Sequence, residues 1–163
     1  MKKVFLFLTA ILLFSCVSQK KLTPNEIKVM TMKHYEESYD LVFSSALSLI
    51  QSEGFLVTNA DKLTGLINAN KQIDNKNAEW QMALLGAAKE ASTAQLAFFI
   101  EKLNDDLTEV KLTIYEGSIT SSTGTWGVKN SSSKNNMVED ATVYSTWFNN
   151  LRTEIARKKV LLE

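Results

Sequence analysis

Apolar residues follow two different spacings between residues 26 and 53, one typical of a strand and one typical of a helix. Over Glu26–His34 apolar and polar positions alternate, which predicts a strand of mixed burial. From residue 39 apolar residues recur every three or four positions, which predicts an amphipathic helix over 39–53. Ser38 is its expected N-cap, and Gly54 stands where a helix ends in the left-handed conformation.

Two pairs of short strands are expected further along. Phe55–Ala60 and Leu66–Lys71 are separated by a turn sequence of Asp, Lys, Leu, Thr and Gly. Gln95–Leu103 and Leu107–Glu116 place alternate apolar residues on one side and are joined by Asn-Asp-Asp, so they predict an antiparallel hairpin.

A second helical spacing precedes that hairpin. Trp80 and the apolar residues after it repeat at the spacing of one helical face, so a helix is expected over 78–91. Gly86 weakens it by about 1 kcal/mol relative to alanine. This helix would either cover the open face or edge of the sheet or insert Trp80 into a partner or a membrane, and the third alternative is that the segment is disordered. A last helix is expected from Met137 or Val138 onward.

The residues from 117 to 136 are almost entirely Ser, Thr, Gly, Asn and Lys, with Trp126 in the middle. Such a composition cannot bury a core of its own, so a flexible loop is expected over 117–136. Trp126 would be either an exposed anchor for sugar, lipid or protein or a plug that folds back onto the domain.

These elements predict an α+β domain over 26–163, with an antiparallel sheet of four to five strands. The expected order is β-α-β-β-α-β-β-α, and two main helices pack on one face of the sheet. The 148 residues from Cys16 to Glu163 are enough for one such domain.

The first 15 residues have the layout of a secretory signal peptide. Lys2 and Lys3 precede a run of about ten apolar residues, which is too short for a membrane-spanning helix of about 20. Ser15, a small residue, stands directly before Cys16, which is the only cysteine of the chain.

This ending resembles the lipobox of bacterial lipoproteins, although Phe14 is bulkier than the commonest residue at its place. The resemblance implies cleavage between Ser15 and Cys16, with diacylglycerol on the Cys16 sulfur and often a third acyl chain on its amino group. Two acyl chains are generally enough for a stable membrane anchor. Residues 16–25 would then be a lipidated tether.

The residues after Cys16 bear on localisation. By the same resemblance, the absence of Asp at the position after the cysteine and of an acidic run favours the outer membrane, with the protein facing the periplasm. No disulfide is possible with one cysteine, and a domain of this size does not need one.

A second resemblance lies in the helix and hairpin before residue 70. The pattern is similar to small envelope lipoprotein domains, such as the repeated domain of the lipoprotein subunit of the outer-membrane β-barrel assembly machine. The likeness covers about 30 residues and concerns packing, so it implies a fold more than a function. It is carried by Ala46-Leu47, Gly54-Phe55-Leu56-Val57, Asp61 and Gly65-Leu66-Ile67.

Charge and chemistry narrow the function classes. Without Lys2 and Lys3 the chain has 16 basic and 18 acidic side chains, so it lacks the excess of positive charge that would indicate a nucleic-acid partner. His34 is the only histidine, and no metal-ligand spacing, nucleophile elbow or phosphate-binding loop accompanies it, so it is expected on the surface or at a strand end. We therefore expect no catalytic residues, metal or cofactor.

The leading hypothesis is a non-catalytic envelope lipoprotein that binds another envelope component, which is expected to be a protein. It would use the sheet edge, the helix over 78–91 or the loop over 117–136. The alternatives are a carrier or sensor of an amphipathic small molecule and, less favoured, a glycan hydrolase using a pair such as Glu139 and Asp140.

Overall fold

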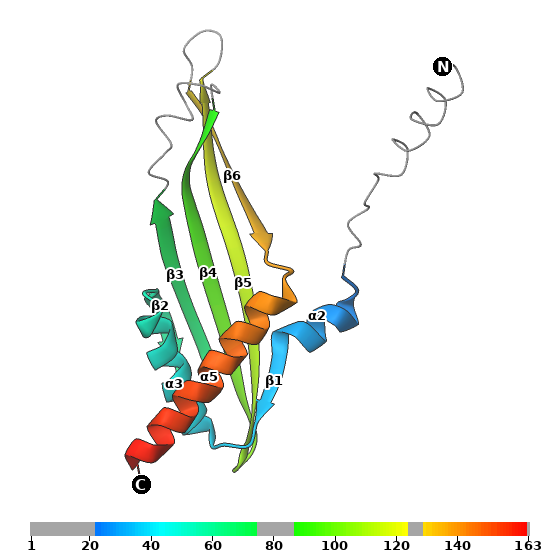
Figure 1. Cartoon of the computed structure of the whole chain (residues 1–163), viewed down its shortest axis with the longest axis vertical. Helices are drawn as coiled ribbons and strands as arrows, with labels where there is room; N and C mark the ends of the chain where they lie inside the picture. Colours follow the sequence, from blue (N-terminus) through cyan, green and yellow to red (C-terminus); the bar gives the residue numbers. More distant parts are fainter. Residues whose placement is uncertain (1–21, 75–86, 124–128, 163) are drawn as a thin grey trace, which may run out of the picture.

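The computed structural model describes residues 22–74, 87–123 and 129–162 (Figure 1). These form three helices and a six-stranded antiparallel sheet, which confirms the α+β class and adds a strand to the expected four to five. In chain order the elements are α2 Pro24–Thr31, β1 Met32–Tyr35, α3 Tyr39–Ser52, β2 Leu56–Asp61, β3 Leu66–Asp74, β4 Ala87–Asn104, β5 Leu107–Thr123, β6 Lys129–Met137 and α5 Ala141–Leu162.

The sheet has the strand order β1-β5-β4-β3-β2, and β6 also pairs with β5. β1 and β6 lie on the same side of β5, beside its first and second halves respectively. Figure 1 shows α3 and α5 across the lower part of the sheet, while the upper parts of β4, β5 and β6 extend beyond both helices. The sheet is therefore covered by helices over only part of its length.

Strict alternation along the central strands directs one set of side chains toward the helices. Between that face and the helices, 18 apolar side chains of the described residues are buried, among them Phe98 and Leu112 of the sheet and Tyr144 of α5, which are fully enclosed. The ring of Trp147 on α5 meets the ring of Phe98 edge-on, with centroids 6.1 Å apart. The Ile114 N–H of β5 donates a 3.3 Å hydrogen bond to the Tyr144 hydroxyl, which ties α5 to the middle of the sheet.

Several expected elements are confirmed. α3 matches the helix expected over 39–53, and Gly54 after it has the left-handed φ of 76°. Ser38 is the N-cap residue, although its side chain makes no capping hydrogen bond. The two strand pairs are β2 with β3 and β4 with β5.

The strand expected over Glu26–His34 is wrong for its first six residues, which belong to α2. The Thr23 hydroxyl accepts a hydrogen bond from the Glu26 N–H at 3.3 Å, and the Glu26 carboxylate accepts one from the Thr23 N–H at 2.7 Å. Pro24 occupies the start of the helix, where its missing N–H costs nothing. This reciprocal capping overrides the alternation, and it also shortens the expected tether, because Asn25 is already helical.

The elements expected over 78–91 and 117–136 also differ from the structure. Residues 87–91 belong to β4 rather than to a helix, and residues 78–86, with Trp80, lie outside the described residues. The expected loop is instead the second half of β5 and most of β6, paired from Tyr115↔Met137 to Thr123↔Lys129. The ladder between the two strands pairs their backbone N–H and C=O groups, as any segment taken out of water requires. Trp126 lies outside the described residues.

The last helix begins later than expected, because Met137 ends β6 and α5 starts at Ala141. The Asp140 carboxylate accepts a 2.8 Å hydrogen bond from the Thr142 N–H, as an N-cap does. Among the described residues, no helix is long and apolar enough to cross a membrane.

An ion pair on α5, between the exposed Arg157 and the partly buried Glu154, makes stability depend on pH. The Arg157 guanidinium donates hydrogen bonds of 2.6 and 2.8 Å to both carboxylate oxygens of Glu154, and these bonds lower the pKa of Glu154 to about 2. The folded pKa lies below the unfolded one, so the pair stabilises the fold above about pH 5, and this contribution disappears as the pH falls toward 2.

We expect Glu154→Gln to reduce the unfolding free energy at pH 7 by less than about 1 kcal/mol and to flatten its decline below pH 5, as measured by urea denaturation. An unchanged pH profile would contradict this assignment.

Candidate binding surface on the open face of the sheet

The candidate surface is the face of the sheet opposite α3 and α5, here called the open face. Along each strand, successive side chains point to opposite faces of the sheet, so the residues between two buried ones point to the open face. Asn70, Gln95 and Tyr115 occupy adjacent register positions on β3, β4 and β5. The next row of the open face is formed in the same way by Asn68, Ala97 and Thr113.

The open face carries large apolar side chains that the fold does not bury. Phe99 is 40% exposed and Tyr115 is 41% exposed, although both belong to central strands. Leu56 on the edge strand β2 is 69% exposed. The Lys111 ammonium lies 5.9 Å from the centre of the Phe99 ring, where it makes a cation–π contact. Aromatic side chains exposed on a sheet face are typical of a binding surface.

A shallow groove of about 350 Å³ crosses β3 and β4 on this face. The small Ala97 side chain leaves room between larger neighbours, and Tyr115 stands at one end. At the other end, a β-bulge between Val57 and Asn59 interrupts the register of β2. There the Thr58 hydroxyl donates a 3.1 Å hydrogen bond to the Asn68 carbonyl. The full lining is Thr58, Asn68, Ala69, Asn70, Gln95, Leu96, Ala97 and Tyr115.

The polar side chains that line this groove are uncharged. Within the described part of the chain, no hydrogen bond reaches the side-chain amides of Asn68, Asn70 and Gln95. Each amide offers two N–H donors and a carbonyl acceptor. The groove therefore presents both kinds of hydrogen-bonding group and no carboxylate, ammonium or guanidinium.

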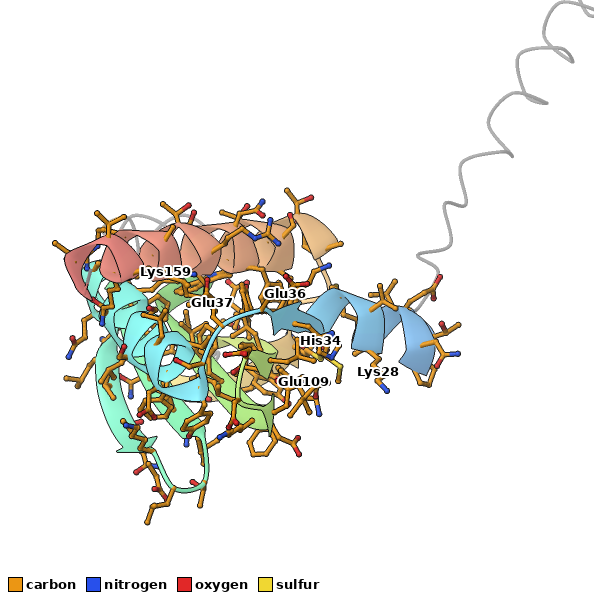
Figure 2. The ribbon with its side chains drawn as sticks, turned by 90° about the horizontal axis from the view of Figure 1, so that it is seen from below. Lys28, His34, Glu36, Glu37, Glu109 and Lys159 are labelled. Atoms are coloured by element: carbon orange, nitrogen blue, oxygen red, sulfur yellow. The ribbon has the colours of Figure 1, made fainter. Side chains whose placement is uncertain are left out.

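His34 lies near the lower end of the sheet, exposed on β1 as the sequence predicts (Figure 2). Its Nε2 is 3.1 Å from a carboxylate oxygen of Glu109, which is the residue opposite it on β5. Of the residues described, none other than Glu109 hydrogen-bonds the His34 ring, and no cluster of His, Cys, Asp and Glu could hold a metal ion. The contact links β1 to β5 at this register position.

A second hollow of about 590 Å³ lies between β1 and α5. Figure 2 shows Lys159 of α5 near Glu37, and their charged groups are 2.9 Å apart. At its base, the Tyr35 hydroxyl donates a 3.0 Å hydrogen bond to the Phe148 carbonyl, and burial raises the pKa of Tyr35. These contacts hold α5 against β1 and the residues that follow it. The side chains they involve therefore have a structural role in the packing of the domain.

None of the site residues expected from the sequence is among the described residues of the open face. Ser15, Cys16, Trp80 and Trp126 all lie outside the described residues, so the structure does not test their roles. In the sequence of the β4–β5 hairpin, the exposed aromatic residues stand at the positions that alternate with the buried ones, where polar residues are expected. An aromatic residue at such a position, as at Tyr115, is the signal that could have found the surface.

Comparison with known proteins adds no assignment. No protein-family model matches the chain, and no curated protein matches its sequence. The role of the chain must therefore be inferred from its own residues.

Proposed function

We propose that the chain is a lipid-anchored protein of the cell envelope whose domain binds another envelope component through the open face of its sheet. The observation that carries the binding role is the groove beside Tyr115, with unpaired amides and exposed aromatic residues on central strands. Residues in these positions contribute little to the core, so a binding role accounts for them better than folding does.

The anchor is proposed from the first residues of the chain. Lys2, Lys3 and the apolar run up to Ser15-Cys16 have the form of a lipoprotein signal, and the acylated Cys16 would hold the protein at the outer membrane, facing the periplasm. The first helix of the described residues, α2, starts at Pro24, so at most about 25 Å of extended chain would separate the lipid from this helix. A domain held this close to the membrane meets its partner at or near the bilayer.

The geometry favours binding at the surface over the carrier alternative. A carrier would hold its ligand between sheet and helices, and that space is occupied by the side chains of Phe98, Tyr144 and Phe148 among others. The glycan hydrolase alternative loses its suggested pair, because the Asp140 carboxylate caps α5. The exposed aromatic and amide groups fit a non-covalent binding module.

Site-specific photo-crosslinking in cells tests this function. A photoreactive residue in place of Gln95, on the open face, is expected to give a discrete crosslinked product. The matched control is the same residue in place of Asn149, which is exposed on α5. Equal crosslinking from both positions, or none from Gln95, would contradict the proposal.

A further inference from the structure

We propose that the groove over Ala97 binds uncharged sugar residues of an envelope glycan. This inference rests on the proposed function, because it names the kind of partner that the open face recognises. It is drawn from the neutral amides, the exposed ring of Tyr115 and the position of the groove in the middle of the sheet.

The first argument is hydrogen-bonding chemistry. A sugar hydroxyl donates one hydrogen bond and accepts others, so a sugar ring needs a surface that offers donors and acceptors close together. The amides of Asn68, Asn70 and Gln95 supply both, and no described side chain or backbone group occupies them. Because they lie on adjacent positions of two paired strands, the sheet holds them in a fixed pattern.

The second argument is the aromatic ring. The ring faces of a sugar carry weakly positive C–H groups, and the face of an aromatic ring carries the negative part of its quadrupole. Tyr115 stands beside Gln95 in the register and keeps 41% of its surface exposed. The row Asn70–Gln95–Tyr115 spans three strands, about 10 Å, which is enough for a disaccharide to contact the amides and the ring together.

The third argument is charge. None of the described residues that line the groove carries a carboxylate, ammonium or guanidinium group, so an anionic or cationic ligand would lose hydration without gaining an ionic partner among them. The volume of about 350 Å³ lies at the small end of the range for ligand sites.

An extended peptide is the main competing ligand, and the position of the groove disfavours it. Extended peptides gain affinity by pairing their backbone with a free sheet edge. Around the groove, the strands β3 and β4 are paired with each other and with their outer neighbours β2 and β5. The backbone groups of β3 and β4 there are already paired within the sheet, so a ligand gains its hydrogen bonds from side chains, which suits a sugar better than a peptide backbone.

The test is calorimetric titration of the full chain, purified in a zwitterionic detergent without a sugar headgroup. The probes are three trisaccharides, the neutral triacetylchitotriose and maltotriose and the anionic trigalacturonate. We expect a neutral trisaccharide to bind and trigalacturonate to bind at least tenfold more weakly. Tyr115→Ala should weaken the neutral sugar about tenfold, whereas Tyr115→Phe, which keeps the ring, should stay near the unmodified affinity. Asn70→Ala should also weaken binding, and Asn149→Ala on α5 should have no effect.

Each outcome decides the inference. The inference is overturned if neither neutral sugar binds at millimolar concentration or if trigalacturonate binds more tightly than both. It is also overturned if the Tyr115→Ala variant binds the neutral sugar as tightly as the unmodified protein does. Thermal unfolding of each variant distinguishes a lost contact from a lost fold, and Tyr115 is exposed enough for its replacement to leave the core intact. A protein crosslinked specifically at Gln95 in cells, without sugar binding, would overturn the glycan inference and leave the proposed function standing.

Discussion

Replacement of Gly65 by alanine is expected to lower the free energy of unfolding by at least about 3 kcal/mol, whereas the same change at Gly54 should cost only about 1 kcal/mol. Both glycines have nearly the same left-handed backbone, with φ of 75° and 76°. At Gly65, however, an added methyl carbon would lie 1.9 Å from the Ile100 carbonyl oxygen, which is backbone and cannot turn away. At Gly54 its nearest neighbour would be the flexible Lys71 ammonium, 3.6 Å away.

Urea denaturation of the two variants measures the difference, and Gly54→Ala is the control for the cost of the left-handed backbone alone. The close approach exists because the Gly65 carbonyl accepts a 2.9 Å hydrogen bond from the Ile100 N–H, which joins the start of β3 to β4. Equal losses would mean that this contact is absent and that β3 and β4 pair in a different register. The row Asn70–Gln95–Tyr115 would then not exist, so the result also bears on the proposed binding surface.

Cys16→Ser is expected to release the protein from the membrane almost completely. Serine has no thiol to receive diacylglycerol, and each lost methylene removes about 0.8 kcal/mol of membrane affinity. The measurement is the distribution of the protein between membrane and soluble fractions after cell lysis and carbonate washing.

Ser18→Ala, a substitution of similar size two residues further on, is the matched control and should stay with the membrane. Cys16→Ser protein that remains in the membrane fraction after washing would show that the attachment does not depend on this cysteine. The lipid anchor would then have to be abandoned, while the binding role of the open face would still stand on its own evidence.

The parts of the fold that follow strong local patterns were predictable from the sequence. The helical spacing between Tyr39 and Ile50, closed by Gly54, predicts α3, because the apolar stripe and the helix stop agree. The hairpin of β4 and β5 is predicted where alternate residues enter the core. The segment Lys129–Met137 is polar except for Met137 at its end, so no spacing of apolar residues marks it as a strand. It is a strand because it pairs with β5.

Two errors have a specific physical cause. The alternation over Glu26–Thr31 predicts a strand, but Thr23 and Glu26 form reciprocal hydrogen bonds that start a helix at Pro24. Residues 87–91 are alanine-rich, which favours a helix in isolation, yet Ala87, Ala88 and Ala91 pair in register with β5. Long-range pairing thus overrode local propensity.

The candidate site was less predictable than the fold. The sequence points to Trp80 as part of an apolar helical face and to Trp126 as the one tryptophan of a polar stretch, and both lie outside the described residues. The groove depends on which residues face each other across three strands. Register between Asn70, Gln95 and Tyr115 is a property of pairing that no single segment encodes.

The central claim is that the open face is occupied in the envelope, and hydroxyl-radical footprinting tests it most directly. Oxidation of Phe99 and Tyr115 would be compared between isolated envelopes and the purified full chain, with the exposed Leu63 and Val160 as controls away from this face. We predict that Phe99 and Tyr115 are protected in envelopes while the two controls are oxidised equally in both samples. Equal oxidation of Phe99 and Tyr115 in the two samples would contradict the account.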